Sequence, residues 1–570
     1  MSTVPGLAFG VRSVVRRIIF PVFIFILLPA GVFCQHTCSL YNDGLAAADT
    51  FLNNEVEWDH YHSAIKPYVD EDLALFHLKQ PPLPQIPEKK QLTIVTPSTP
   101  FPFKRLSWQN FYSQPNDVLP SEKNAAFLIR PIYDLNAGYD VMSNRFLYTS
   151  AGGIILDADY RQKIGIEVRA AGGITTLPNY LDSIAKKTGM IPGWGDRAYP
   201  NGNANYSFQH ISGNIIWRPS KIFNLQIGSD KHFWGDGYRS LFLSDIGPAI
   251  PYIKQTTAIW KLQYTSLFLW MQDWTNSNGS AKDFRSKFAT LHYISFNATK
   301  WLNLGVFEGI VWQGNDNNRM RGFDPDYLNP VVFFRPVEYS LGSSDNAMLG
   351  FAYKVRFDKN NQLYSQIILD EFYLKEVKHY KNGWWANKQG LQMGYKIFNV
   401  HKIPNLNLQM ELNIVRPYTY THGSSQQNYS NAGMPLAHPL GANFAEKIVI
   451  LSYSKNKYSV TGKIVSAKYG LDSLGKDYGQ NIFIPYGDRS STNKTNPNGR
   501  DYNHHLYDGI KTSLFYFEVK GSYTFNTKFP LRAEMLIGIR NEHNGVIGSK
   551  RSAYAQVGFS LPLWRTYRDY

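Results

Sequence analysis

Apolar and polar residues alternate with a period of two in many segments of the chain. Residues 406–414 are Leu-Asn-Leu-Gln-Met-Glu-Leu-Asn-Ile, so every second side chain is apolar. Because side chains alternate across a β-strand, one face of this segment is apolar and the other is polar. The same pattern recurs at residues 363–370, 515–523, 531–540 and 553–563. Strands with an apolar outside and a hydrated inside predict an all-β, antiparallel transmembrane β-barrel.

The first residues have the features of an export signal. Three arginines between positions 12 and 17 precede an apolar run over 18–33. This run is shorter than the roughly 20 residues that a membrane helix needs, so we expect a signal peptide over 1–34. Cleavage after Cys34 leaves Cys38 as the only cysteine and excludes an intramolecular disulfide, whereas retention of Cys34 would make the chain a lipoprotein. No other segment is apolar enough for a membrane helix.

The remaining chain divides into two parts. Residues 35–120 show helix-like spacing in their first half and seven prolines between 81 and 103, which predicts a small N-terminal periplasmic α-helical segment and a stiff linker. Residues 121–570 are the predicted barrel, and about 450 residues allow a number of strands in the high teens. The longest polar segment, 487–508, is expected to be an extracellular loop.

Composition supports a membrane wall and suggests acidic partners. Of the 570 residues only 18% are charged and 15% are aromatic, the opposite of a disordered chain. The formal net charge of +15 favours anionic lipid or anionic polysaccharide. Nucleic acid is excluded because the chain is exported. We therefore expect outer-membrane lipid and an acidic surface or capsular polysaccharide as partners.

Candidate chemistry is densest in residues 228–245. Cationic, acidic and aromatic side chains surround Gly235 and Gly237, and the residues we select are Lys231, His232, Trp234, Asp236, Tyr238, Arg239 and Asp245. Arginine forks and flat aromatic faces suit a polar, ring-shaped ligand such as a sugar. The structural alternative is a strand-turn-strand whose charged groups pair inside the barrel.

Three further clusters contribute candidates for glycan binding. They are Arg335 and Glu338 within 333–346, Asp370 within 369–372, and Arg416 and His438 in the Pro- and Gly-rich stretch 416–444. Neighbouring strand residues face opposite sides, so Asp370 and Glu371 cannot share one scissile bond unless the strand is bulged. We expect Asp370 to pair with an arginine in the lumen.

No motif indicates catalysis, a cofactor or a metal. The pair His422 and His438 lacks a third ligand at a recognisable spacing. The sequence also lacks a phosphate-binding loop, a dinucleotide fingerprint and a Gly-x-Ser-x-Gly elbow. We therefore expect a protein that is not an enzyme and binds no cofactor.

Several segments, in this order, resemble the outer-membrane capsule-assembly family Wzi, in the Bacteroidetes-type branch that includes the gliding-motility protein RemB. The most specific is Trp-Gly-Asp-Gly-Tyr-Arg-Ser at 234–240, and the others lie at 62–68, 191–195, 335–339, 369–372, 416–420 and 436–444. The resemblance implies a barrel of 18 strands whose lumen is closed by loops. It also implies a lectin-like role in holding polysaccharide, or a role in surface adhesion and gliding.

Four functions are open at this point. The first is a non-enzymatic barrel of the Gram-negative outer membrane that binds or anchors surface polysaccharide. The second is a porin for oligosaccharides, which a polar lumen would also suit. The third is a hydrolase that uses lumenal carboxylates, and the fourth is a motility or secretion accessory protein that binds other proteins.

Overall fold

A computed structural model describes most of the predicted barrel and a short piece of the N-terminal segment. The described residues are 62–67, 125–160, 163–275, 277, 279–316, 319–320, 322, 324, 327, 345–371, 373–473, 475–489, 501–525, 531–546, 548–561 and 567–570. The predicted signal peptide, the Pro-rich linker and both cysteines lie outside them.

In the described part of the chain, 18 antiparallel strands form one closed barrel. Each strand pairs with the next along the chain, and β2 closes the ring by pairing with β25. The strands are β2 (Ala125–Asp140), β3 (Arg145–Tyr160), β4 (Ile164–Thr176), β6 (Asn205–Trp217), β7 (Phe223–Asp230), β9 (Ile250–Ile259), β10 (Leu262–Asp273), β11 (Arg285–Asn297), β12 (Leu302–Gln313), β15 (Asn346–Arg356), β16 (Asn361–Glu371), β17 (Lys388–Ile397), β18 (Leu406–Val415), β21 (Phe444–Lys455), β22 (Tyr458–Leu471), β23 (Ile510–Thr524), β24 (Arg532–Asn544) and β25 (Gly548–Leu561). The predicted fold class is confirmed.

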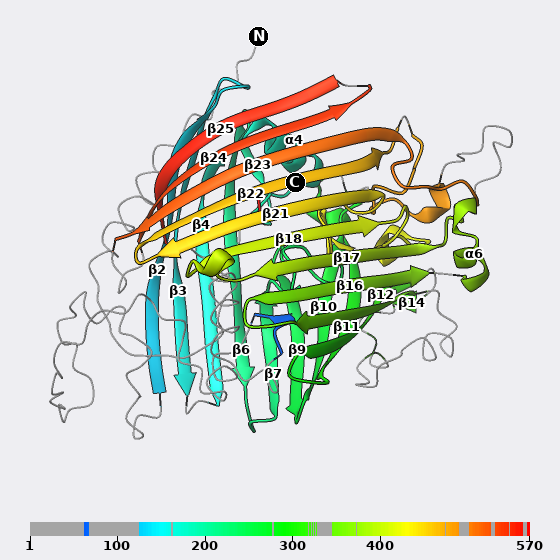
Figure 1. Cartoon of the computed structure of the whole chain (residues 1–570), viewed down its shortest axis with the longest axis horizontal. Coiled ribbons are helices and arrows are strands. Elements are labelled where there is room, and N and C mark those ends of the chain that lie inside the picture. Colours follow the sequence, from blue (N-terminus) through cyan, green and yellow to red (C-terminus); the bar gives the residue numbers. More distant parts are fainter. Residues whose placement is uncertain are drawn as a thin grey trace, which may run out of the picture.

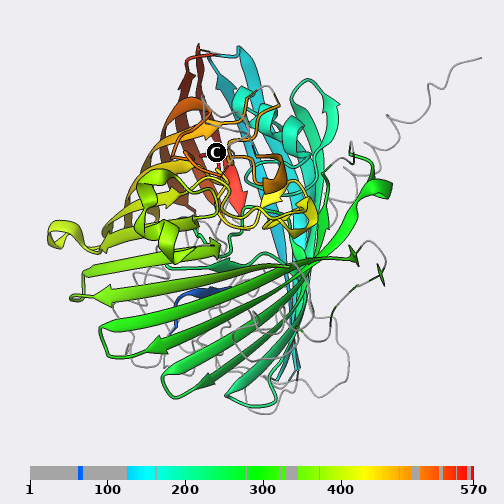
Figure 2. The same ribbon diagram turned by 90° about the vertical axis from the view of Figure 1, so that its right-hand side faces the viewer.

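The strands tilt against the barrel axis. In Figure 1 the wall from β16 to β25 lies in front, and its strands cross those of the rear wall from β2 to β12. Figure 2 shows the ring of strands from the side, with coil gathered at one end. Such crossing of front and rear strands is the consequence of the tilt that closing a sheet into a barrel requires.

The elements outside the ring are short. Two helices and five 3-10 turns are described, and none of these helices is long and apolar enough to cross a membrane. They are α4 (Asn179–Thr188), α6 (Leu374–Lys378), η2 (Ala281–Asp283), η4 (Tyr380–Asn382), η5 (Val400–Lys402), η6 (Ser425–Gln427) and η7 (Tyr486–Asp488). The short strands are β1 (Ile65–Lys66), β5 (Tyr199–Gly202), β8 (Phe233–Trp234), β13 (Asn315–Asp316), β14 (Arg319–Met320), β19 (Ser430–Asn431) and β20 (Met434–Pro435).

The two ends of the barrel differ in the length of their connections. At one end, which we call the short-turn end, strands join through tight turns such as 260–261 and 456–457. The other end, the long-loop end, carries the segments 231–249, 416–443 and 472–509. Outer-membrane barrels have short periplasmic turns and long extracellular loops. The long-loop end therefore faces the cell exterior.

Alternation along the strands builds the two faces of the wall. In β18, Met410 points outward and is 39% exposed, whereas Glu411 and Asn413 point into the lumen and are buried. In β24 the exposed outward residues are Met535, Ile537 and Ile539. The apolar outer band and the polar inner face are those of a membrane-spanning barrel, as the period-two pattern predicts.

Aromatic residues encircle the short-turn end. They are exposed on the outer surface, and a lysine lies within four residues of most of them: Tyr160, Trp217, Trp260, Trp301, Phe357, Tyr458 and Phe525. Tyr and Trp are enriched where the hydrocarbon of a bilayer meets the headgroups. This ring marks the periplasmic boundary of the membrane-spanning wall.

The outer face of β10–β12 departs from the apolar rule. Ser266, His292 and Glu308 are partners across these strands, point outward and are buried. The hydroxyls of Ser266 and Tyr264 contact His292 Nδ1, so hydrogen bonds among the side chains accommodate polar groups there. Here the sequence alternation alone does not predict the surface.

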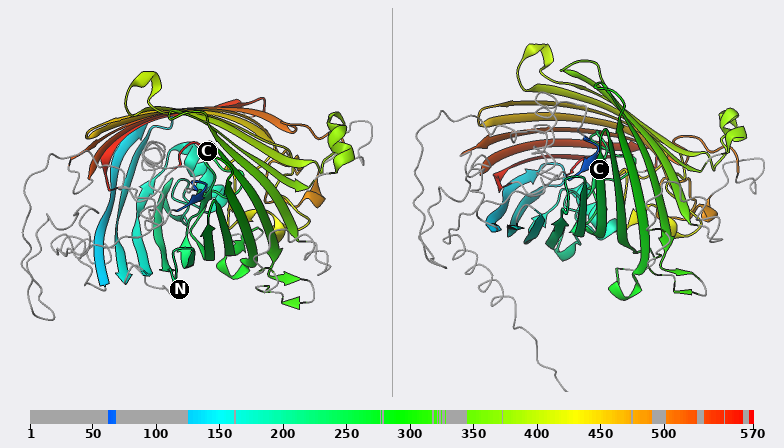
Figure 3. Two further views of the ribbon diagram at one scale, coloured as in Figure 1. Left: turned by 60° about the horizontal axis from the view of Figure 1, so that its bottom comes forward. Right: turned by 90° about the horizontal axis from the view of Figure 1, so that it is seen from below.

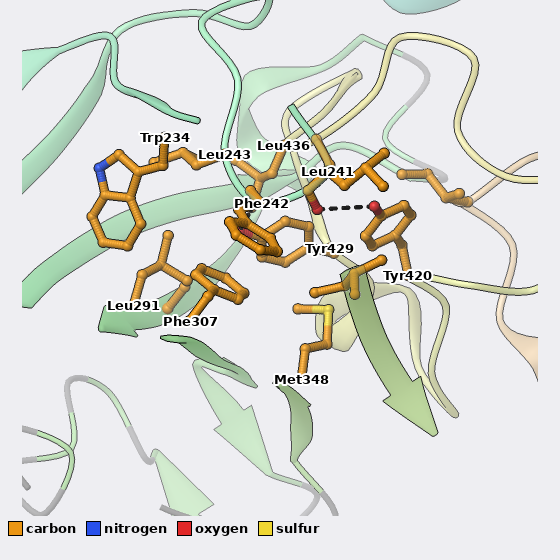
Figure 4. Packing of buried hydrophobic residues seen from close by; sticks show 14 of the residues in the cluster. Trp234, Leu241, Phe242, Leu243, Leu291, Phe307, Met348, Tyr420, Tyr429 and Leu436 are labelled. Atoms are coloured by element: carbon orange, nitrogen blue, oxygen red, sulfur yellow. Dashed lines mark hydrogen bonds between the residues drawn. The ribbon is translucent and has the colours of Figure 1, made fainter. Parts of the chain in front are cut away.

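The lumen is filled rather than fully hydrated. Segments 231–249 and 416–443 fold inward, and residues 62–67 lie within the ring of strands, where β1 pairs with β8 (Figure 3). Within the ring, Trp234 and Phe242 from one loop contact Phe307 from the wall (Figure 4). A wet interior, as we expected, is therefore wrong for the β10–β12 part of the wall, because loop side chains meet apolar wall side chains there.

A lysine on the outer wall should destabilise the folded barrel in a membrane. For Ile537→Lys, in the middle of β24, we expect a loss of roughly 2–4 kcal/mol, because a cation would face hydrocarbon. Val546→Lys is the control, since Val546 lies in the exposed β24–β25 hairpin. Urea unfolding in lipid vesicles, followed by heat-modifiable gel migration, measures both. Equal losses for the two variants would contradict the lipid-facing assignment.

Candidate functional site

The candidate segment 231–245 forms an inward-folded loop that is held at both ends by backbone pairing. Ile65 and Lys66 of β1 pair with Trp234 and Phe233 of β8, and Trp234 N–H donates to Leu243 O at 2.9 Å. β1, from the N-terminal part of the chain, thus adds an extended stretch beside Phe233 and Trp234 of the loop. The described part of the predicted N-terminal helical segment is this extended stretch in the lumen.

Trp234 is fully buried. Its ring meets the edges of Tyr293 and Phe307, at centroid distances of 6.0 and 6.1 Å, and Phe242 stacks on Phe307 at 4.6 Å (Figure 4). Tyr420 Oη donates to Leu241 O at 2.9 Å and joins the second inward loop to the first. Because no face of the indole reaches solvent, Trp234 serves the packing of the lumen.

Arg239 occupies the centre of a buried ionic network. Its guanidinium lies 3.2 Å from Glu446 Oε1 and 3.1 Å from Asp569 Oδ2, and all three side chains are almost fully buried. Tyr238 lies beneath the guanidinium at 5.0 Å and donates from Oη to Asp569 at 2.9 Å. Lys463 on the wall lies 3.5 Å from the same carboxylate. The C-terminal residues 567–570 are thereby drawn into the lumen.

The protonation of this network follows from its charges. Burial alone would raise the pKa of Asp569, but Arg239 and Lys463 outweigh it and lower that pKa to about 2. Burial lowers the pKa of His438, despite the nearby Glu446. His438 Nε2–H donates to Glu446 Oε2 at 2.7 Å, and its Nδ1 accepts from Leu440 N–H at 3.2 Å. His438 is therefore neutral and structural.

Glu411 fixes the backbone of the loop. It accepts the N–H groups of Tyr238 at 2.6 Å and Arg239 at 3.0 Å, and Tyr364 Oη donates to it at 2.7 Å. Glu411, Glu446, Lys463 and Asp569 were absent from our sequence candidates. Glu411, Glu446 and Lys463 are charged residues at inward positions of the neighbouring strands β18, β21 and β22, whereas Asp569 follows the last strand and meets Lys463 only because residues 567–570 enter the lumen.

Three more candidates of segment 231–245 are also paired, whereas the buried ring of His232 packs edge-on against Tyr252. Lys231 Nζ donates to Trp194 O at 2.5 Å, Tyr567 Oη donates to Asp245 at 2.6 Å, and Asp236 lies 3.5 Å from Lys354. A cavity of about 10 Å³ lies beside Lys231, His232 and Asp245. This is the room of a single water molecule, so no sugar fits there.

The carboxylate of Asp370 shows a different partner from the one we expected. Asp370 is buried and accepts the backbone N–H of Tyr420 at 2.7 Å, and none of the arginines that the structure describes contacts it. The register of β16 against β17 shifts between Leu369 and Glu371, and Glu371 pairs with Lys388 at 3.1 Å. Among the described residues, the donor to Asp370 therefore comes from an inward loop. Arg335 and Glu338 lie outside the described residues.

Partly exposed aromatic rings gather at the long-loop end, where the described residues of the β16–β17 and β22–β23 connections meet. We call Trp384, Trp385, Tyr486, Arg489 and Tyr502 the mouth cluster. The ring centroids of Trp385 and Tyr486 lie 4.8 Å apart, and those of Trp384 and Tyr502 lie 5.1 Å apart. The guanidinium carbon of Arg489 lies 4.1 Å from the ring centroid of Trp385. Tyr502 is 42% exposed. Unlike Trp234, these rings lie where an external ligand can reach them.

Charged side chains surround the mouth cluster. Arg489 pairs with Asp501 at 2.5 Å, and Lys388 lies 4.3 Å from the ring of Tyr486. Arg416 donates to Asn387 O at 2.7 Å and to Trp384 O at 3.3 Å, so this predicted candidate positions the tryptophan loop. Burial lowers the pKa of Arg416, and Asp508 opposes the shift. Sequence reasoning missed the cluster, although Trp384-Trp385 is an adjacent tryptophan pair.

A metal centre finds no support in the part of the chain that the structure describes. No group of three or more His, Cys, Asp or Glu side chains converges there. His422 hydrogen-bonds Gln427 at 2.9 Å and His438 hydrogen-bonds Glu446, so each histidine has a protein partner of its own.

Comparisons with known proteins define the class by fold. No family model matches the sequence, and no curated protein matches it significantly. Wzi from Escherichia coli, described as an outer-membrane protein involved in group 1 capsule assembly and a carbohydrate-binding β-barrel, is 13% identical. The match covers 94% of this chain and 100% of that chain, with a TM-score of 0.53. The chain thus has the fold of an outer-membrane β-barrel, and Wzi is a solved example of that fold.

Two Pseudomonas aeruginosa barrels have lower similarity. OprD is 9% identical over 80% of this chain and 98% of that chain, with a TM-score of 0.41. OpdL is 10% identical over 77% of this chain and 99% of that chain, with a TM-score of 0.40. Similarity at this level adds nothing to the functional argument.

Removal of the central cation should loosen the inward loops. For Arg239→Gln we expect a loss of about 3–5 kcal/mol, because Glu446 and Asp569 would remain buried without it. The control is Arg285→Gln: the Arg285 side chain is 42% exposed, and its buried partner Asp273 keeps hydrogen bonds from Thr275 and Ser425, so we expect a loss of about 1 kcal/mol or less. Thermal unfolding and limited proteolysis of segment 231–249 measure both. Equal melting temperatures for the two variants would contradict the central role of Arg239.

The ion pair between Arg239 and Asp569 predicts that the stability of the fold depends on pH. The lowered pKa of Asp569 adds stability that is complete above its ordinary value of 3.8 and is lost as the pH falls toward 2. In Arg239→Gln the loss should begin at a higher pH, because burial would then raise that pKa. Melting curves between pH 2 and 6 report the shift. An unchanged profile would mean that Asp569 does not depend on Arg239.

Proposed function

We propose that this protein resides in the outer membrane and binds acidic surface polysaccharide at its extracellular mouth, without catalysing a reaction on it. The observation that carries the proposal is the mouth cluster. Its rings are partly open to solvent, come from two long loops and stand beside cations at the end that faces outward. Surface adhesion or gliding would follow from such binding and would need no second activity.

The mouth cluster has the chemistry for a sugar ring. The flat, apolar faces of Trp384 and Tyr502 can cover the C–H face of a pyranose, and the phenol keeps a polar tip for its hydroxyls. The Arg489–Asp501 pair offers donors and an acceptor side by side. Sites of this kind combine apolar ring surface with a few placed polar groups.

Lysines beside the cluster favour an acidic polymer. Lys375 and Lys378 of α6 and Lys381 of η4 are exposed, and Glu376 is the acidic residue among them. Helix α6 lies at the right-hand edge of Figure 1. Tyr502 Oη lies 3.4 Å from Glu376, which connects α6 to the mouth cluster. Excess positive charge would raise the local concentration of a polyanion. The carbohydrate binding described for Wzi supports a sugar as ligand but comes from a distant relative in sequence.

Loss of the mouth cluster should weaken polysaccharide binding. For Tyr502→Ala and for Trp385→Ala with Arg489→Ala we expect about tenfold weaker binding of alginate, a uronate polymer, because stacking area and donors are lost. The control is Trp260→Ala, an exposed tryptophan at the short-turn end. Biolayer interferometry with the intact barrel in nanodiscs measures the dissociation constants.

The glycan class is tested in the same assay. Lys375→Gln with Lys378→Gln and Lys381→Gln should weaken alginate binding and leave binding of neutral dextran unchanged. Wild-type protein that binds neither polymer, nor the polysaccharide of its own cell surface, would refute the proposal.

A porin would behave differently in planar bilayers. Because loops, β1 and residues 567–570 fill the lumen, we expect wild-type protein to conduct very little. Deletion of residues 233–243 should raise the single-channel conductance, since that loop supplies much of the filling. Large, stable wild-type channels would favour oligosaccharide transport over surface binding.

A further inference from the structure

Basic side chains gather on the outer surface of the barrel at its long-loop end. They lie on β21, β22, β23 and β25 (the yellow-to-red wall of Figure 1), and all are exposed: Lys447, Lys468, Lys511 and Arg551. We call these four residues the outer basic patch. Each lies within four residues of the strand end that meets the long loops, so the patch stands at the level of the headgroups.

The strand register shows that the four cations form one surface. Lys447 pairs with Ser466, which lies two residues from Lys468, so these lysines are diagonal neighbours. Lys468 pairs with Ser513, which lies two residues from Lys511, so the second pair is diagonal as well. Such neighbours lie roughly 7–8 Å apart. Arg551 on β25 pairs with Asn541 on β24. Four strand spacings separate β25 from β21, so Arg551 lies about 19 Å from Lys447.

Polar side chains and the ring of Phe515, which pairs with Ser466 and Asn541, lie between the cations, and carboxylates do not. Ser466, Ser513, Asn541 and His543 point outward within the patch, and His543 Nδ1 contacts Ser549 Oγ at 2.9 Å. The carboxylates of these strand ends, Glu446 and Glu542, point inward. Among the described residues, the outer basic patch therefore presents donors without an outward carboxylate in the same strands.

The patch is local and is not part of a general basic ring at this end. At matching outward positions the rest of the described wall carries Phe146 on β3, Ile174 on β4, Trp270 on β10 and Ile414 on β18. Apolar neighbours also border it on both sides, with Leu412 next to Lys447 and Tyr139 beyond β25. Lysines that merely flanked a membrane would be spread around the circumference.

We propose that the outer basic patch binds the phosphorylated headgroup of a glycolipid in the outer leaflet. A phosphate group accepts charge-assisted hydrogen bonds from lysine and arginine, and basic clusters beside a membrane span attract anionic headgroups by about 1 kcal/mol for each cation. The patch suits a headgroup with two phosphates on a sugar frame. The three lysines are neighbours that can share one phosphate, and Arg551 lies far enough from Lys447 to contact the other. Its serine, asparagine and histidine side chains can hydrogen-bond the sugar hydroxyls.

Native mass spectrometry of the intact barrel in detergent tests the proposal. The probes are bisphosphorylated lipid A, the same lipid without phosphates, and phosphatidylglycerol as the phospholipid comparison. The variant is K447Q/K468Q/K511Q/R551Q. The control is K221Q/K300Q/K359Q/K402Q, which removes the same number of exposed cations at the short-turn end. Heat-modifiable migration shows that each barrel is folded, and K468Q/K511Q replaces the quadruple variant if that one fails.

Wild-type and control protein should retain bisphosphorylated lipid A at least about tenfold better than the dephosphorylated lipid, and the patch variant should lose that difference. Binding should also weaken with added salt. Equal retention by wild type and patch variant would overturn the proposal. Equal loss in both quadruple variants, or equal retention of phosphatidylglycerol, would show attraction to anionic lipid in general and would overturn it as well.

Discussion

The buried guanidinium of Arg239 holds the interior of this barrel together. It joins an inward loop to Glu446 on the wall and to Asp569 near the C-terminus, so three distant parts of the chain meet at one cation. A buried charge is tolerated only when partners surround it, and here the two carboxylates and the rings of Tyr238 and Tyr567 surround the guanidinium. Because Glu446 belongs to the wall, the ion pair with Arg239 stabilises the inward position of the loop only when the sheet is formed.

This arrangement determines where a ligand can bind. The segment with the richest chemistry in the sequence uses its charges for internal pairs and its tryptophan for packing. The cavity beside Lys231, His232 and Asp245 has room for about one water molecule, so no sugar fits there. Rings that remain partly open, such as Trp385 and Tyr502, lie on loops at the outer end. Loops are the part of a barrel that can vary without loss of the wall.

The positive charge of the chain is likewise distributed by the fold. Cations that face the lumen pair with carboxylates, as Lys388 does with Glu371, or donate to backbone carbonyls, as Lys231 does to Trp194. Cations on the outer surface occur beside aromatic residues at the short-turn end, around the mouth, and in the patch on β21–β25.

The amino-acid sequence by itself determined the wall. Alternation at 406–414 correctly assigned Met410 to the outside and Glu411 to the inside, because side-chain direction in a strand depends only on position along it. Only the tertiary structure decided which inward groups meet. Arg239, Glu446 and Asp569 are far apart in the chain, and their contact depends on barrel closure and on the course of two loops. The same reason explains why Trp234, a good sugar-stacking candidate by residue type, is core, whereas Trp385 is surface.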